Sequence, residues 1–231
     1  MVLSLDTTSR AGSAALIVDG VVRVQHSGDP ALTHGQRLPG DLMQVLGRGG
    51  ATPQQVDLLA LAAGPGSFTG LRVGIAAMQG LAMALDRRVV PIPTLEALAH
   101  AAGSGEGPVG VWMDAQRGEV FAALYDEDAR GLHMLVDGTA LSPEDTIERW
   151  RDRLGAGPVR FIGDGAVRHA SRLLPAVPAA TIIDPAPPLA GVIGLLAAAA
   201  PARAVLPHAI VPVYIRRPDA ELARDRRTGA R

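Results

Sequence analysis

The 231-residue chain contains no lysine, no asparagine and no cysteine, and aromatic residues make up only 3% of it. All 22 residues of the lysine-plus-arginine class are therefore arginine. Without lysine, the chain cannot form a Schiff base or supply a P-loop lysine, and without cysteine it has no thiol nucleophile, disulfide or thiolate metal ligand. These absences narrow the possible mechanisms, but they do not indicate a function.

The charge is nearly balanced, since 22 arginines oppose 23 acidic residues. Such a chain has no overall field that attracts a phosphate polymer, so contact with nucleic acid would need a local basic patch. The amino-terminal segment has no basic region typical of a secretory signal. The longest apolar stretch, residues 189–200, is shorter than the roughly 20 residues needed to cross a bilayer. We therefore expect a cytoplasmic protein without membrane contact.

The order of elements favours an α/β protein with two related halves. A strand at residues 2–5 leads to Asp6, a turn and a hairpin marked by Asp19-Gly20. After a glycine-rich linker at 102–108, a strand at 109–113 leads to Asp114, a turn and another strand. This repeat suggests two units built on one plan. A last strand is expected at 211–215. The predicted divisions are an amino-terminal lobe, a carboxy-terminal lobe and an arginine-rich tail, at 1–103, 104–217 and 218–231.

Two aspartates stand where strand-and-turn phosphotransfer folds hold a nucleotide's metal ion. Such folds need a glycine two residues after the aspartate, but Thr8 follows Asp6 and Gln116 follows Asp114 at that distance. This favours a turn or capping role for both aspartates. Asp6, Thr7 and Thr8 remain the candidates for contact with a nucleotide.

A glycine-rich turn, residues 64–70, precedes an apolar helix at 70–85. Such a turn either binds an anion at the helix N-terminus or is purely structural, and both alternatives stay open here. It is no P-loop, because Leu71 and Arg72 follow where lysine and serine or threonine are required. The helix itself is apolar nearly all round, which fits either the core or a subunit interface.

The remaining candidates are weaker. No two of the six histidines stand three to five residues apart, so we expect no metal site. Residues 216–231 carry six arginines, which either contact RNA phosphates or form a solvated terminus.

Several segments together resemble the TsaB (YeaZ) family. They are LSLDTTSRAGSAAL, HGQRLP, GPGSFTGLRVGIAAMQGLAMAL, PTLEALA, MDAQRGEVFAALYD, FIGDGA and PVYIRRP, which span residues 2 to about 218. The resemblance implies a two-lobed actin/Hsp70-like fold of the ASKHA, ribonuclease H-like class. It also implies a non-catalytic partner of TsaD, acting with the ATPase TsaE. Together these proteins make N6-threonylcarbamoyladenosine beside the anticodon of tRNAs that read codons starting with A.

The resemblance also implies the division of labour. TsaD-type enzymes carry a pair of metal-binding histidines in the stretch where this chain has Thr94 and Leu98. Neither side chain replaces an imidazole ligand, so no cofactor is expected. The segment 163–166 is too short for a double-glycine adenosine loop.

We therefore predict a scaffold that binds TsaD through helices at 34–47 and 70–85, or that pairs with a second copy when TsaD is absent. The predicted contact residues are His34, Leu38, Leu42, Gly70, Arg72, Gly74, Ala77 and Met78. Two alternatives remain: an ATP-dependent phosphotransferase of the sugar-kinase type, using Asp6 and the first turn, and an RNA-binding module acting through the tail.

Overall fold

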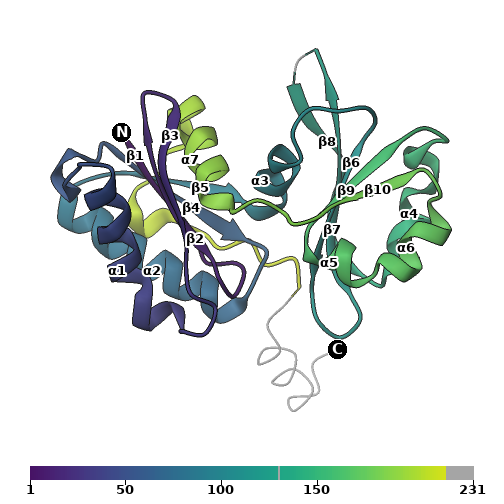
Figure 1. The fold of residues 1–231 in the computed structure, drawn as a ribbon, viewed down its shortest axis with the longest axis horizontal. Helices are drawn as coiled ribbons and strands as arrows, with labels where there is room; N and C mark the ends of the chain where they lie inside the picture. The colour runs from purple at the N-terminus through teal and green to yellow at the C-terminus, as the bar shows by residue number, and fades with distance from the viewer. Residues whose placement is uncertain (130, 217–231) are drawn as a thin grey trace.

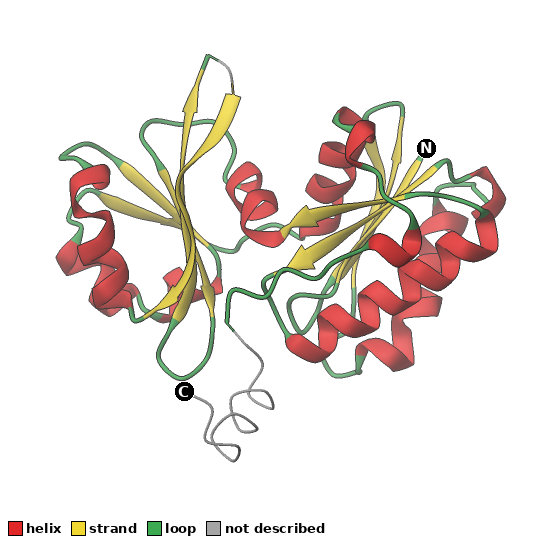
Figure 2. Cartoon of the chain, turned by 180° about the vertical axis from the view of Figure 1, so that it is seen from behind, coloured by secondary structure: helices red, strands yellow, loops and turns green. Residues whose placement is uncertain are grey.

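The computed structural model describes residues 1–129 and 131–216, which form two lobes side by side (Figures 1 and 2). Each lobe is built on a five-stranded sheet with helices packed against it. The α/β class and the two-lobed ASKHA-like architecture predicted from the sequence are thus confirmed. The arginine-rich tail falls outside the described residues.

The first sheet has the strand order β3-β2-β1-β4-β5. Strands β1, β2 and β3 form an antiparallel meander, and β4 and β5 lie parallel to β1. The hairpin predicted at Asp19-Gly20 is present, and both residues have the positive φ that a tight hairpin turn requires. The strands are β1 (Val2–Asp6), β2 (Ser13–Val18), β3 (Val21–Ser27), β4 (Leu58–Gly64) and β5 (Val89–Pro93).

The second sheet repeats this topology. Its order is β10-β9-β6-β7-β8, so β6, β7 and β8 correspond to the meander, and β9 and β10 to the two parallel strands. The predicted relationship between the two halves is therefore visible in strand order and direction. The strands are β6 (Val109–Asp114), β7 (Val120–Asp128), β8 (Gly131–Leu141), β9 (Val159–Ile162) and β10 (Ala180–Ile183).

Helices cover both faces of the first sheet. Helices α1 (His34–Arg48) and α2 (Phe68–Leu85) pack on one face, over a core cluster that includes Leu3 and Leu16. Helix α1 begins behind a capping box of Thr33 and Gln36. The opposite face carries α3 (Thr94–Ala101) and α7 (Leu189–Ala199). Three short 3-10 helices lie at Pro53–Gln55, Pro201–Arg203 and Pro207–Ala209.

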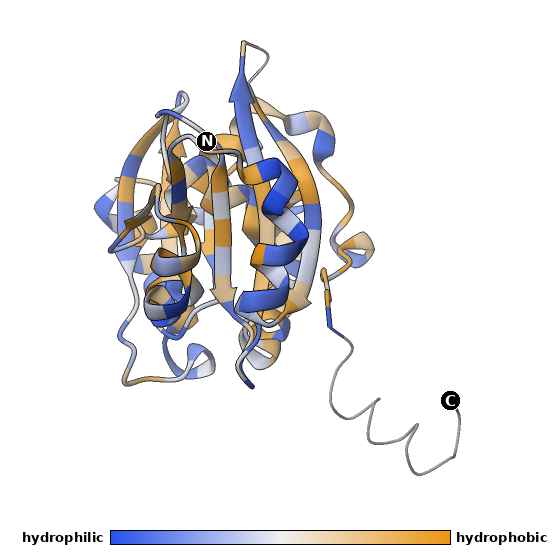
Figure 3. Ribbon diagram, turned by 90° about the vertical axis from the view of Figure 1, so that its right-hand side faces the viewer, coloured by the Kyte–Doolittle hydropathy of each residue, from blue (hydrophilic) through white to orange (hydrophobic). Residues whose placement is uncertain are grey.

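The second lobe has its own core on one face of its sheet. Trp112, Trp150 and Phe161 are fully buried there, with Trp112 and Phe161 packed edge to face at 5.4 Å between ring centroids. The helices around this core are α4 (Pro143–Leu154), α5 (Asp164–Arg168) and α6 (Ala170–Ala176). Figure 3 shows many apolar residues along the strands.

Helix α7 follows the second sheet in sequence but packs on the first. The Ser4 hydroxyl donates to the Ala190 carbonyl at 2.6 Å, and the Ala190 N–H donates to the Ser13 hydroxyl at 3.0 Å. A Cβ on Gly194 would lie 2.0 Å from Ile17, so glycine is needed at this approach. The range 104–217, predicted as the carboxy-terminal lobe, therefore contains a helix that contacts the first lobe.

Residues 211–215 were predicted as a strand, and this prediction is wrong. The segment is extended, but in the sheet it makes a single backbone bond, from the Val213 N–H to the Ala63 carbonyl at 2.7 Å. Strand β4, which carries Ala63, already pairs with β1 on one side and β5 on the other. Its pairing with β1 ends at Leu61, so only the last residues of β4 are left unpaired on that side, too few for another full strand.

Candidate functional site

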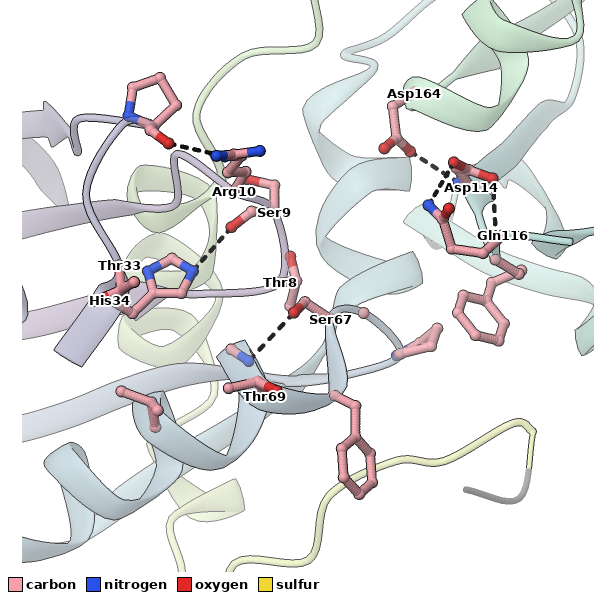
Figure 4. Close-up of a pocket in the computed structure, with 18 of the residues that line it drawn as sticks. Thr8, Ser9, Arg10, Thr33, His34, Ser67, Thr69, Asp114, Gln116 and Asp164 are labelled. Carbon is pink, nitrogen blue, oxygen red and sulfur yellow. Dashed lines mark hydrogen bonds between the residues drawn. The ribbon is translucent and has the colours of Figure 1, made fainter. Parts of the chain in front are cut away.

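An open cleft of about 1020 Å³ runs between the two lobes. The turn after β1, the loop before α1 and the turn before α2 form its first-lobe wall, and the turn after β6 forms much of the other. Figure 4 shows Thr8 and Ser67 on one wall, with Asp114 and Gln116 on the other. Of the candidates predicted for contact with a nucleotide, Thr8 lines the cleft, whereas Asp6 and Thr7 are buried behind it.

Asp6 closes the turn on the first-lobe side. It is 4% exposed, and its Oδ1 accepts hydrogen bonds from the Thr8 backbone N–H at 2.8 Å and the Thr8 hydroxyl at 2.6 Å. Burial raises the pKa of Asp6, and the bonds from Thr8 offset part of that rise. Thr8 therefore occupies the carboxylate of Asp6 with hydrogen bonds inside the turn. A glycine at this position would have left the turn open to a phosphate.

Asp114 closes the matching turn of the second lobe. Its Oδ1 accepts from the Gln116 backbone N–H at 3.0 Å, and its Oδ2 accepts from the Gln116 side-chain amide at 2.7 Å and from Arg168 at 2.9 Å. The Asp114 backbone N–H in turn donates to Asp164 at 2.9 Å. Both halves thus use the aspartate that ends the central strand to fix a turn.

The glycine-rich turn, residues 64–70, is fastened to the turn after β1. The Ser67 N–H donates to the Thr8 carbonyl at 3.0 Å, and a Cβ on Gly66 would lie 2.5 Å from the Thr8 Cβ. The Ser67 hydroxyl accepts from the Gly70 N–H at 3.2 Å as the N-cap of α2. Two amides that could bind an anion are therefore used inside the lobe, which favours a structural turn.

The small residues at the start of α2 make room for Thr7. A Cβ on Gly70 would lie 2.1 Å from the Thr7 carbonyl oxygen, and one on Gly74 would lie 2.2 Å from the Thr7 hydroxyl. Real Cβ atoms do not approach other atoms this closely, so both positions need glycine. These glycines are explained by packing within the lobe.

A buried polar cluster lies beneath α1. Arg37 is 8% exposed and donates to the Asp41 carboxylate, the Ala11 carbonyl and the ring of His34. His26 reaches the other oxygen of Asp41 at 3.3 Å. The cluster ties α1 to β3 and to the turn that borders the cleft.

His34 lines the cleft as part of this cluster. Its Nδ1 lies 2.9 Å from Arg37 and its Nε2 lies 3.0 Å from the Ser9 carbonyl. Because a guanidinium only donates, Nδ1 accepts and Nε2 carries the proton that bonds Ser9. Burial and the charge of Arg37 lower the pKa of His34. A neutral imidazole therefore positions the turn.

Thr94 and Leu98 belong to the interior of the molecule. Thr94 is fully buried at the start of α3, and Leu98 is 4% exposed within the core between the two sheets. Among the residues that the structure describes, no group of three or more His, Asp or Glu side chains lies close enough to hold a metal ion.

The outward side of α1 and α2 is a second candidate site, which we call the α1–α2 face. A Cβ on its three glycines would meet no atom within 4 Å, and its two methionines are 56% and 73% exposed. The charged residues exposed on these two helices are Arg48, the last residue of α1, and Arg72, one turn into α2. The face is formed by Gly40, Met43, Gly47, Ala76, Gly80 and Met83.

Helix α2 is long and apolar enough to cross a membrane by length and composition, although core helices of soluble proteins pass the same test. A third of it is buried in the molecule. One side therefore serves the core, and the other side adds apolar surface to the α1–α2 face. The two alternatives left open for this helix, core or interface, apply to opposite sides of it.

The predicted contact residues mostly point the other way. The side chains of Leu38, Leu42 and Met78 are packed in the first-lobe core, and Gly70 and Gly74 are buried against Thr7. A buried residue cannot contact a partner while the lobe stays folded.

The other three predicted contacts are accessible to different degrees. His34 and Ala77 are half-buried, and Arg72 is exposed, with its guanidinium carbon 3.8 Å from the centre of the Phe68 ring. Sequence reasoning missed the exposed glycines and methionines. Their helical spacing, as in Gly40, Met43 and Gly47, was the available sign of a common face.

Comparisons of the sequence and of the structure with known proteins agree with each other. A protein-family model described as TsaD, tRNA N6-adenosine threonylcarbamoyltransferase, matches residues 30–150. The chain is 34% identical over 157 residues to the tRNA threonylcarbamoyladenosine biosynthesis protein TsaB of Escherichia coli (strain K12), covering 67% of this chain and 68% of that protein. It is 35% identical over 171 residues to the protein of the same name from Haemophilus influenzae, covering 67% and 71%.

The fold agrees with these matches. The solved structure of YeaZ from Pseudomonas aeruginosa superposes with a TM-score of 0.78 at 30% identity, covering 92% of this chain and 98% of that one.

Proposed function

The chain belongs to the TsaB (YeaZ) family, and on that premise we propose that it serves in the synthesis of threonylcarbamoyladenosine in tRNA as a non-catalytic subunit. Its task is to bind a TsaD-type subunit that carries out the transfer. The modified nucleoside is the adenosine beside the anticodon in tRNAs that read codons starting with A.

The α1–α2 face is the observation that carries this proposal. It is exposed and largely apolar, with Gln44 and Arg72 as its exposed polar neighbours, and its glycines leave open space above the helices. Glycine and alanine on adjacent helices allow the helices of another protein to approach closely, and exposed methionines adapt to the shape of a partner. Apolar patches of this kind mark interaction surfaces on soluble proteins.

The match to the TsaD family model supports the choice of partner. It covers residues 30–150, which include both α1 and α2. A TsaD-type protein of related fold would present a similar helix pair, so the two could meet face to face about a pseudo-twofold axis. The same self-complementary geometry would allow a homodimer when TsaD is absent. TsaE would join the assembled pair in the cytoplasm.

The residues at the expected catalytic positions support a non-catalytic role. Leu98 is a packed core side chain at one of the two positions where TsaD-type enzymes carry a metal-binding histidine. Thr8 binds the carboxylate of Asp6 where a phosphate-binding turn would have glycine. Together these contacts leave the phosphotransferase alternative without an open phosphate loop.

Depletion of the protein in its own organism tests the proposed function. Threonylcarbamoyladenosine in bulk tRNA should fall and should be restored by the wild-type chain. A variant with Gly80→Leu should restore it poorly, while Asp152→Leu, on the exposed side of α4, should restore it fully. An undiminished level of the modified nucleoside after depletion would rule out the proposal.

A further inference from the structure

One extended segment, residues 211–216, crosses from the first lobe to the second, and we call it the strap. Figure 1 shows it as the yellow stretch that leaves the left-hand lobe and approaches the right-hand one. Just before the strap, Ile210 is 6% exposed in the first-lobe core. The Val213 N–H donates to the Ala63 carbonyl at 2.7 Å, and a Cβ on Gly64 would lie 2.6 Å from the Val213 oxygen. The strap thus lies tightly on the end of β4.

Tyr214 attaches the strap to the first turn of α2. Its ring centroid lies 5.7 Å from that of Phe68, and its hydroxyl lies 3.4 Å from the Arg72 Nε, which donates to it. The Arg72 guanidinium also covers the Phe68 ring at 3.8 Å. Backbone bonding, a buried side chain and an aromatic pair therefore hold the strap to the first lobe.

The attachment to the second lobe is slighter. Arg216 donates to the Glu119 carboxylate at 2.7 Å, and the two side chains are 26% and 36% exposed. The Arg216 guanidinium also lies 5.9 Å above the ring of Phe121. Half-buried Ile215 packs at the margin of the core cluster shared by the two sheets, and a Cβ on Gly138 of β8 would be 2.9 Å from it. A partly exposed ion pair is worth little and is weakened by salt.

Helix α3 provides the fixed contact between the lobes. It packs on β4 and β5 and also on β6, β7 and β8, within a core cluster that includes residues of both sheets. The strap crosses separately and lines the cleft with residues 213–216. If the strap leaves the second lobe, the lobes can tilt about α3 while that core stays intact.

We propose that the strap is a latch on the cleft between the lobes. Its first-lobe end stays attached, and the Arg216–Glu119 pair is the releasable end. Breaking that pair widens the cleft without unfolding either lobe. The proposal does not depend on the identity of the partner that binds the α1–α2 face.

Distances between spin labels on the two lobes test the latch. The chain has no cysteine, so Arg23→Cys on β3 and Arg153→Cys on α4 label one exposed site in each lobe. Pulsed electron–electron double resonance then gives the distribution of distances between the two labels in the full chain. Arg216→Ala should raise the fraction of the wider separation about two- to fivefold, the range that a partly exposed pair supports. Raising the ionic strength should increase the fraction of the wider separation in the wild-type protein and leave that fraction unchanged in Arg216→Ala.

Two further variants distinguish the latch from a general loss of charge. The exchange of Arg216→Glu with Glu119→Arg should return the distribution toward wild type. Arg203→Ala removes a pair of similar exposure, to Glu96 at 2.6 Å, that does not cross the cleft, and it should leave the separation unchanged. An unaltered distribution in Arg216→Ala, equal widening in Arg203→Ala, or a double exchange that stays open would overturn the proposal.

Discussion

The backbone N–H of Ser67 donates a hydrogen bond to the carbonyl oxygen of Thr8 at 3.0 Å. This bond joins two turns that, by their sequences, could each hold a phosphate. It makes them a structural joint, with Thr8 also bound to Asp6. The joint fixes the start of α2. The side of the helix that carries Gly70 and Gly74 is thereby buried against Thr7, and the opposite side faces solvent.

Replacing Gly74 should destabilise the fold. Replacing it with leucine places atoms where the Thr7 hydroxyl lies, and overpacking of this kind costs about 1–3 kcal/mol. Urea denaturation should show this loss in the free energy of unfolding. The matched variant is Gly80→Leu on the same helix, where an added Cβ meets open space and helix propensity improves by about 0.5–1 kcal/mol. Equal stability of the two variants would show that the contact with Thr7 is unimportant.

The buried pair beneath α1 should respond strongly to the loss of one partner. Asp41→Ala leaves the Arg37 guanidinium buried without its carboxylate, at a cost of about 3–5 kcal/mol. Glu148→Ala breaks a pair of the same charge type with Arg151 on the surface of α4 and should cost about 0–1 kcal/mol. Thermal or urea unfolding measures both. A small effect of Asp41→Ala would mean that Arg37 finds water or another acceptor.

Asp6 should make stability depend on pH in the direction opposite to that of a paired carboxylate. Burial raises its pKa, so the folded protein binds this proton more tightly than the unfolded chain does. The contribution of Asp6 to the free energy of unfolding is fully present below about pH 3.8, the pKa of the group in the unfolded chain. It is lost as the pH rises through the raised pKa of the folded state. Asp6→Asn keeps an oxygen for Thr8 and removes the charge. Its stability relative to wild type should therefore increase with pH.

Urea unfolding over a pH series measures this difference. Asp114→Asn is the matched control, because the carboxylate of Asp114 is paired with Arg168 and its replacement should not stabilise the protein at neutral pH. A difference between Asp6→Asn and wild type that stays constant with pH would contradict the assignment.

The isolated chain should give little or no heat with Mg-ATP in a calorimeter. The reason is that the two turns that would hold the phosphates are bonded to each other through Ser67 and Thr8. Stoichiometric binding that disappears in Asp6→Ala would instead favour the sugar-kinase alternative.

The two-lobed fold could be predicted because its determinants are local. Asp19-Gly20 specifies a hairpin, and the strand ending in Asp6 has a counterpart ending in Asp114. The burial of Gly70 and Gly74 could not be predicted, since small residues do not reveal which neighbour they accommodate. That neighbour, Thr7, comes from a distant part of the chain.

The prediction of a strand at 211–215 was wrong for a related reason. Its composition suits a strand, but pairing requires a free sheet edge, and β4 is unpaired only at its last residues. The candidate site divides in the same way. Its helices could be chosen from the sequence pattern, whereas the exposed side of each helix depends on how it packs against the sheet.

Binding of a TsaD-type subunit from the same organism, measured by calorimetry, tests the central claim most directly. Wild type should bind, and Gly80→Leu should weaken binding at least tenfold, because its side chain fills the space that a partner helix would occupy while the lobe stays folded. Asp152→Leu on α4 should bind like wild type. If Gly80→Leu, correctly folded, binds TsaD with unchanged affinity, then the α1–α2 face is not the contact surface.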